Sequence, residues 1–494
     1  MNFNTTDTAF AFVMLACGFL YCNLIQLYML GAGVTIFAGV VLTVSFVYLS
    51  KSGFKQNLKS RICLTLTALS AIQFALFDNQ LISSLNFMFL TITFVYWICL
   101  STGREIDKKL SVYIIGDAIK QGICIPFLNF GCCWGGVKKG ISTQEKGKGI
   151  LAALIGILIF FPLIAIVINL LTSADLAFEY FMIRFYEIIS IDRVISYIIQ
   201  FIFGIPVAFY LYGLIYGDVK GRHKEVVTSL SVDSAAKNIR IAPKMTIYSA
   251  LMAFNLIYFL FFAVQTGYLF SAFQGNLPEA FSYAEYARRG FFELCAVAGI
   301  NLGVLTTAHL FVKREEGEEP KLLKASTLAI SLFTILLIAT ALSKMILYIN
   351  VYGLTQLRVY TSWFMILLLF IFVIICARQF KKFNSAKAVI IGFIVMFVTL
   401  SYSNVDGHIV KYNFDRYQNG TLEMLDIEAI SKLSAAAVPY LYEMYQATDG
   451  NDYYRQTLAH YIKYSGTYGE SGFRGFNVQK SRADEIRNRL FVHD

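Results

Sequence analysis

The chain has 494 residues, of which 57% are hydrophobic and only 15% are charged. A water-soluble protein of this length cannot bury so much apolar surface, so the composition excludes an ordinary soluble enzyme and predicts a protein that sits largely in lipid. The net charge of +10 does not indicate nucleic-acid binding, because the excess Lys and Arg residues lie between the hydrophobic runs, where anionic membrane lipids are the natural partner.

Eleven hydrophobic runs approach the length of about 20 residues that a helix needs to cross a bilayer. We therefore expect an all-α, polytopic membrane protein, with residues 1–402 as a transmembrane bundle and residues 403–494 as a soluble helical tail. The third and eleventh runs are the shortest. The predicted spans are Phe10–Leu27, Leu30–Leu49, Ile62–Phe77, Leu81–Leu100, Ile150–Leu171, Val194–Tyr216, Met245–Phe270, Gly290–Val312, Ala325–Ile349, Val359–Ala377 and Ala388–Tyr402.

The basic residues alternate between the gaps that separate these runs. Twenty-six of the 42 Lys and Arg residues lie in the gaps after the second, fourth, sixth, eighth and tenth runs, and only five lie in the other gaps. Basic loops stay on the cytoplasmic side during insertion, so we expect the tail to be extracytoplasmic. Met1–Thr8 carries no Lys or Arg and therefore does not resemble a signal peptide. We expect the N-terminus to be extracytoplasmic as well.

Two parts of the chain are predicted not to span. At about residues 106–130, apolar residues recur at helical spacing, which is typical of a helix lying on the inner membrane surface. In the tail, the apolar pattern from Leu425 to Met444 predicts one helix, and Asp452–Tyr464 and Gln479–Phe491 predict two more. Because the tail is too short for a rich core of its own, we expect it to lean on the outer face of the bundle.

Charged residues at membrane depth are costly unless they are paired, so each is a candidate for a functional role. Glu285, Arg289 and Glu293 fall one turn apart on a predicted helix at the outer mouth of the eighth run, with Arg288 beside them. They form either an outward-facing site in which Arg288 or Arg289 binds an anionic group, or a structural ladder of ion pairs.

Further candidates follow on the same side. Asp175 and Glu179 form either a cation or substrate site, or the N-terminal cap and first turn of a short interfacial helix. Arg358 either binds an anionic headgroup, pairs with Asp175 or Glu179, or extends to the interface. Lys344 lies inside the ninth run and needs a carboxylate, for which Glu293 is a possible partner, unless it too reaches the interface.

Common catalytic and metal-binding motifs are absent from the sequence. The nine cysteines contain no C-x-x-C pair, the five histidines have no metal-ligand spacing, and no nucleophile elbow, zinc-protease motif or phosphate-binding loop occurs. We therefore predict no catalytic residue, no metal site and no cofactor.

Several stretches resemble an uncharacterised bacterial family of polytopic membrane proteins, catalogued as domain of unknown function 4173 and related to 4153. They are Leu171–Phe178, the run from Tyr283 through Arg289 to Glu293, Tyr352–Arg358, and the start of the tail around Asn404-Val-Asp406. The resemblance runs from about Leu171 to the end of the chain. It implies a location in the bacterial plasma membrane, and it implies no activity, substrate or catalytic residue.

Three functions remain open from the sequence. The first is a non-enzymatic sensing, partner-binding or transport-related protein with a polar site open to the extracytoplasmic side. The second is a membrane-embedded transferase for a lipid-linked or phosphate-bearing substrate, with Asp175 as base or metal ligand. The third is a structural or regulatory subunit whose tail binds another protein through Tyr453, Tyr454, Tyr461 and Tyr464.

Overall fold

The structure, a computed structural model, describes most of the chain. The described residues are 3–142, 160, 163–164, 166–175, 178–182, 191–223, 225–274, 291–313, 320–448, 452–466 and 472–491. Within these ranges the named elements are all helices, and the all-α prediction is confirmed.

Nine of the helices in the described part of the chain are long and apolar enough to cross a membrane. Each corresponds to one predicted span. Helix α3 (Leu58–Leu76) matches the third predicted span but is not among the nine, and the fifth span, Ile150–Leu171, lies mostly outside the described residues. The nine are α1 (Thr5–Leu24), α2 (Ala32–Lys51), α4 (Gln80–Thr102), α10 (Ile191–Lys220), α12 (Lys244–Gln274), α14 (Phe291–Phe311), α15 (Lys321–Tyr352), α16 (Gln356–Phe380) and α17 (Ser385–Tyr402).

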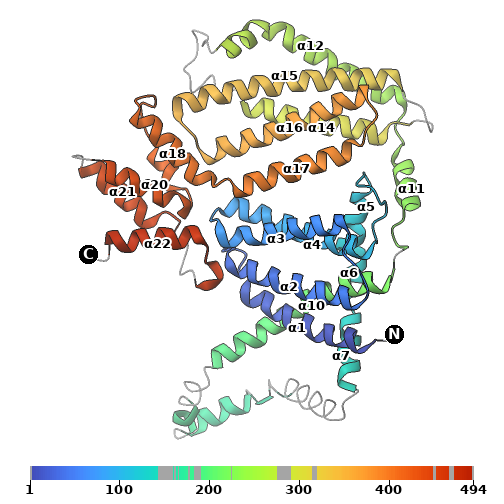
Figure 1. Ribbon diagram of the computed structural model, residues 1–494, viewed down its shortest axis with the longest axis vertical. Coiled ribbons are helices and arrows are strands. Elements are labelled where there is room, and N and C mark those ends of the chain that lie inside the picture. Colours follow the sequence, from blue (N-terminus) through green and yellow to red (C-terminus); the bar gives the residue numbers. More distant parts are fainter. Residues whose placement is uncertain are drawn as a thin grey trace.

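The long helices form two neighbouring groups (Figure 1). One contains α1–α4 and α10, and the other contains α12 and α14–α17, with α17 packed against α3 and α4. In the first group α1 packs along α10, where a Cβ atom on Gly18 would lie only 2.2 Å from the carbonyl oxygen of Gly204. Small residues of this kind let two membrane helices approach closely, so glycine is required at this crossing.

The described residues of all five basic gaps meet at one end of the two groups (Figure 1). The short helix α11 (Ser229–Ile239) lies at this end too, and the tail lies at the other (Figure 1). Hydrogen bonds join the basic gaps to one another in the following pairs: Lys59 Nζ to the Lys108 carbonyl, Arg104 Nε to the Asp218 carbonyl, Lys313 N to the Ala242 carbonyl, and Asn384 Nδ2 to the Leu110 carbonyl.

The N-terminus also lies at the basic end, which contradicts the expectation that it shares a side with the tail. Lys139 donates to the carbonyl of Phe3, and the Lys220 ammonium lies 2.9 Å from the buried carboxylate of Asp7. Tyr48, near the end of α2, donates to the same carboxylate. Since α1 runs from the basic end to the tail end and α2 returns, the two termini lie at opposite ends (Figure 1).

The segment predicted as one surface helix is shorter and more buried than expected. Residues 106–113 form bends and turns, and the helix covers α5 (Ile114–Ile119), a π-helical turn η1 (Lys120–Cys124) and α6 (Ile125–Leu128). Lys120 and Gln121 are buried, because α6 packs on α10 and η1 packs on α4. A second short helix, α7 (Cys132–Ser142), packs against α1.

The tail begins directly after α17 and contains several short helices. The apolar positions between Leu425 and Met444 are buried as predicted, but they are divided among three short elements and the segments beside them instead of forming one helix. Pro439 explains one break, since proline is compatible only with the first turn of a new helix. The elements are α18 (Val405–Gln418), which the sequence pattern did not predict, α19 (Ile427–Ser431), η2 (Ala435–Ala437), α20 (Val438–Ala447), α21 (Asp452–Tyr464), η3 (Phe473–Gly475) and α22 (Val478–Phe491).

Single engineered cysteines test this arrangement. In intact cells, a membrane-impermeant maleimide should label Met424→Cys in the tail, where Met424 is 81% exposed. It should label Thr5→Cys and Lys55→Cys only after the membrane is opened, because both positions lie at the basic end. The wild-type chain gives the background, since its nine cysteines are buried or half-buried. Labelling of Thr5→Cys together with Met424→Cys in intact cells would contradict the arrangement of the termini.

Candidate functional site

The tail docks on three loops that project from the end of the bundle opposite the basic gaps. At the α1–α2 loop, the Ala32 amide donates to the Phe476 carbonyl at 2.8 Å. Next to it the two backbones nearly touch, because a Cβ atom on Gly31 would lie 2.6 Å from the carbonyl carbon of Gly475. At this loop the tail is therefore held through main-chain contacts that tolerate only glycine.

The α15–α16 loop is held by helix α18. Asn413 accepts from the Leu354 amide at 2.6 Å and donates to the Leu354 carbonyl at 2.8 Å. One turn later, Arg416 donates to the carbonyls of Ile349 and Asn350 in the last turn of α15, and the Ile349 carbonyl also accepts from the Gly353 amide. Asn413 and Arg416 thus cap the end of a membrane-spanning helix from the tail.

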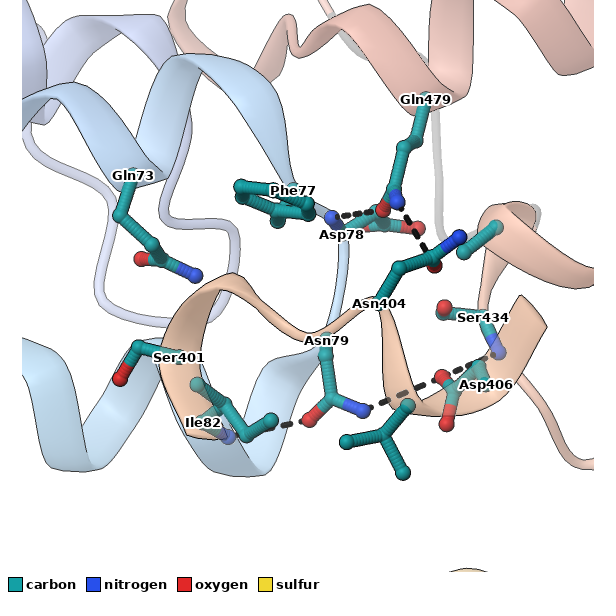
Figure 2. A pocket seen from close by; sticks show the side chains of 12 residues that line it. Gln73, Phe77, Asp78, Asn79, Ile82, Ser401, Asn404, Asp406, Ser434 and Gln479 are labelled. Carbon is teal, nitrogen blue, oxygen red and sulfur yellow. Dashed lines mark hydrogen bonds between the residues drawn. The ribbon is translucent and has the colours of Figure 1, made fainter. Parts of the chain in front are cut away.

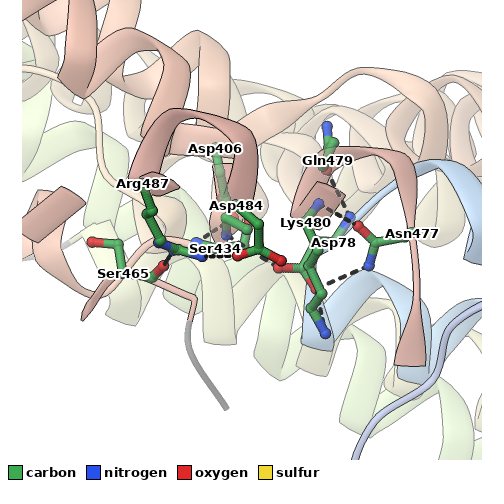
Figure 3. A network of polar contacts seen from close by, with 10 residues as sticks. Asp78, Asp406, Ser434, Ser465, Asn477, Gln479, Lys480, Asp484 and Arg487 are labelled. Atoms are coloured by element: carbon green, nitrogen blue, oxygen red, sulfur yellow. Dashed lines mark hydrogen bonds and ion pairs between the residues drawn. The ribbon is translucent and has the colours of Figure 1, made fainter. Parts of the chain in front are cut away.

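The α3–α4 loop supplies Asp78, whose carboxylate is the first centre of a polar network (Figure 3). Its Oδ2 atom accepts from the backbone amide of Ala435 at 3.1 Å. Its Oδ1 atom lies 3.4 Å from both the Lys480 ammonium and Nδ2 of the Asn477 side chain. The backbone amide of Asp78 donates to Gln479 at 2.7 Å. One bundle residue therefore contacts both η2 and the start of α22.

Asp406 of α18 is the second centre, and it is only 1% exposed. Its carboxylate accepts from Asn79 Nδ2 and the Ser434 amide, both at 3.1 Å, and from Gln356 Nε2 at 2.7 Å. Figure 2 shows Asn79 of the α3–α4 loop pointing towards this carboxylate. None of these donors carries a charge, so burial raises the pKa of the Asp406 carboxyl above its ordinary value.

A cavity of about 450 Å³ lies between these two carboxylates and the surrounding loops. Both acids line it, together with two lysines, amide and hydroxyl side chains, and a group of apolar residues from the α1–α2 loop and the start of α4. We call it the tail cleft. Its lining residues are Leu27, Tyr28, Met29, Leu30, Asp78, Asn79, Gln80, Leu81, Ser83, Ser84, Gln356, Asp406, Lys432, Ser434 and Lys480.

Of the residues singled out from the sequence, those that the structure describes do not line the tail cleft. Most of the predicted ladder lies outside the described residues, namely Glu285, Arg288 and Arg289. Glu293 is its one member that the structure describes. The charge of Glu293 acts on Lys344, the lysine for which it is a possible partner.

The other predicted residues are not gathered into one site. Arg358 donates to the carbonyls of Tyr352 and Gly353, and its guanidinium lies 4.1 Å from the centre of the Tyr348 ring. In these contacts it helps to cap the end of α15. Asp175 is exposed, and its carbonyl accepts from the Glu179 amide at 3.0 Å, so the two belong to one local turn.

The cleft residues were missed because most of them are uncharged or apolar and they come from several separate segments. The gap between the third and fourth runs contains only Asp78, Asn79 and Gln80, and no Lys or Arg. Two signals were present. Asp406 belongs to the Asn404-Val-Asp406 stretch that carries the family resemblance, and Asp78 is a charged residue directly after a membrane run.

The fold defines the chain as a helical, multi-pass protein of the membrane class, with a helical tail on its loops. A family model, described as "Domain of unknown function (DUF4153)", matches residues 62–444, and the chain belongs to this family. This is the related family, not 4173 itself, and the match begins earlier than Leu171, so it includes the third and fourth predicted spans. No curated protein and no solved structure matches the chain.

Replacement of Asp78 tests how the tail is held. Asp78→Ala leaves the part-buried amide of Ala435 and the ammonium of Lys480 without their acceptor, which costs about 1–3 kcal/mol for a buried polar group. We expect a lower unfolding midpoint in detergent and faster proteolysis of the tail. Glu428→Ala is the matched control, because its ion pair with Lys432 is solvent-exposed and should leave both readouts unchanged. Equal behaviour of the two variants would refute the docking role of Asp78.

The raised pKa of Asp406 predicts a pH dependence with a definite sign. A carboxyl that binds its proton more tightly in the folded protein contributes stability below its unfolded pKa, and this contribution is lost as the pH rises through the folded pKa. The unfolding midpoint of the wild type should therefore rise, relative to that of Asp406→Asn, as the pH is lowered from 7.5 towards 4.5. A difference that stays constant, or falls, over this range contradicts the assignment.

Proposed function

We propose that the protein is a non-enzymatic binding protein of the bacterial plasma membrane, and that the tail cleft is its ligand site on the extracytoplasmic side. The observation that carries the proposal is the cavity of about 450 Å³, which is formed jointly by the tail and the bundle loops. This volume lies within the range of small-molecule sites, which combine an apolar lining with a few convergent polar groups. The lining of the cleft has this composition.

Sidedness supports an outward-facing cleft. The five basic gaps and the tail lie at opposite ends of the two helix groups (Figure 1). Basic loops are retained in the cytoplasm, so the tail and its cleft face outwards if the chain obeys this rule. The loops that bear the cleft contain almost no Lys or Arg, as expected for segments that cross the membrane during insertion.

The ion pairs and hydrogen bonds of the lining side chains favour binding over catalysis. Asp78 is paired with Lys480, and Asp406 is surrounded by neutral hydrogen-bond donors. A nucleophilic mechanism needs a nucleophile beside a base, and the described lining of the cleft contains neither His nor Cys. Asp175, the base of the transferase alternative, does not line the cleft.

Sensing is the form of binding that the geometry supports best. Asp78, Asp406 and Lys480 line the cleft and also hold the tail on the bundle. A ligand that contacts these residues must therefore change the free energy of tail docking, and by linkage tail docking must change ligand affinity. We propose that the tail reports occupancy of the cleft to a protein partner through its exposed surface.

Native mass spectrometry of the full-length protein, released from lipid nanodiscs, tests the proposal. The wild type should retain a bound small molecule, and Ser84→Trp should lose it, because Ser84 is an exposed residue of α4 that lines the cleft. Thr91→Trp is the matched control. Thr91 is also exposed on α4 and, like Ser84, bonds the carbonyl four residues earlier, but it does not line the cleft.

Retention of the molecule by Ser84→Trp, or its loss from Thr91→Trp alone, would place the site elsewhere. A wild-type protein that carries nothing would contradict the proposed function. If the bound molecule were chemically altered on incubation, binding without catalysis would be wrong.

A further inference from the structure

The mouth of the tail cleft is apolar and lies beside the ends of two membrane-spanning helices. Three of its lining residues, Leu27, Tyr28 and Leu81, are 67%, 69% and 51% exposed. They lie where α1 ends and α4 begins, at the level at which the membrane-spanning helices meet their outer loops. A site for a freely soluble polar ligand has no need of exposed apolar residues at this level.

From this mouth, an apolar stripe continues along α4. Leu81, Leu85, Met88 and Ile92 are 51%, 45%, 62% and 60% exposed, and their spacing places them on one face of the helix. At about 1.5 Å per residue, the stripe descends roughly 16 Å from the cleft into the depth of the membrane. The polar cleft and the apolar stripe together have the shape of a site for a headgroup with an attached acyl chain.

Inside the cleft, charges of both signs lie close together. Asp78 and Lys480 are part-buried, with side chains 16% and 11% exposed, and their 3.4 Å separation is long for an ion pair. Lys432 at the rim is 70% exposed. The carboxylate of Asp406 lies beneath, adding negative potential to the acidic side. A purely anionic ligand would be repelled by the acidic side of the cleft, and a purely cationic ligand by the basic side. A ligand that carries both charges can place each charge beside the side of opposite sign.

We propose that the ligand of the tail cleft is a membrane lipid with a zwitterionic headgroup that carries a primary ammonium and a phosphate. The ammonium donates to Asp78, the phosphate accepts from Lys480 and Lys432, and an acyl chain lies along Leu81, Leu85, Met88 and Ile92. The lipid enters sideways from the outer leaflet. This inference rests on the proposed function and specifies the chemistry of the same site.

A headgroup series tests the proposal with the full-length protein. Nanodiscs contain equal amounts of phosphatidylethanolamine, phosphatidylcholine and phosphatidylglycerol, and the lipids retained after release are counted by native mass spectrometry. Phosphatidylethanolamine should be retained about tenfold more than either competitor, because phosphatidylcholine has no N–H donor for Asp78 and phosphatidylglycerol has no cation. Equal retention of the three, or preference for phosphatidylglycerol, would overturn the headgroup assignment.

Two exposed positions provide variants that keep the fold. Lys432→Gln removes a phosphate partner and should lower phosphatidylethanolamine retention several-fold, since Lys432 is 70% exposed and holds only a surface ion pair. Leu81→Gln makes the mouth polar and should lower lipid retention without affecting binding of free phosphoethanolamine. Leu69→Gln is the control, because Leu69 is an exposed apolar residue on α3 that does not line the cleft.

The outcomes separate this inference from the proposed function. If no lipid is selected but Ser84→Trp still expels a bound water-soluble molecule, the lipid assignment is wrong and the cleft remains a binding site. If free phosphoethanolamine binds and the lipid does not, the headgroup chemistry is right and the membrane source is wrong, which overturns the proposal as stated. If neither lipid nor soluble molecule responds to Ser84→Trp, both proposals are wrong.

Discussion

Two carboxylates placed between the tail and the bundle constrain this structure most strongly. A carboxylate removed from water is costly unless donors surround it, and Asp78 and Asp406 each take donors from across the interface, although Asp406 also accepts from Ser434 of the tail. Asp78 belongs to the bundle and accepts from Ala435 and Lys480 of the tail, whereas Asp406 belongs to the tail and accepts from Asn79 and Gln356 of the bundle. Because each side satisfies the charge of the other, the tail has one docking position, and that position defines the cleft.

Features that depend on local composition were predictable from the sequence. Nine described helices match predicted spans, because an apolar run of this length has few alternatives to a membrane helix. Helix α21 covers Asp452–Tyr464 as expected, and the apolar pattern from Leu425 to Met444 lies in the tail core. Periodicity says which residues are buried, but it does not show where the backbone turns. A single helix was therefore predicted where Ser434 and Pro439 divide the chain into three elements.

Features that depend on distant contacts were not predictable. Asp7 pairs with Lys220, more than 200 residues later, and no local pattern predicts this contact. The cleft was missed for a similar reason. Asp78, Gln356, Asp406 and Lys480 come from four separate segments, and no single stretch of the sequence shows that they line one cavity. The side of the N-terminus is different, because it follows from the charge rule: two runs precede the first basic gap, so the rule places the N-terminus on the same side as this gap, against the expectation drawn from Met1–Thr8.

Glu293 and Lys344, two of the charged residues predicted from the sequence, lie in the second helix group beside a series of polar contacts. Helix α14 runs antiparallel to α15. The charge of Glu293 acts on Lys344, Asn301 donates to Thr334, and His309 is hydrogen-bonded to Thr327, in this order along the two helices. Polar contacts between membrane helices fix their register, since an unpaired polar group in hydrocarbon is unfavourable. The order of the three pairs gives Lys344 a structural explanation that involves no ligand. A polar group that helps to set helix register is poorly placed to exchange partners, whereas the cleft residues lie in loops and at helix ends, where a ligand can replace a docking contact. For this reason we assign the proposed binding function to the tail cleft and not to the charged residues within the membrane.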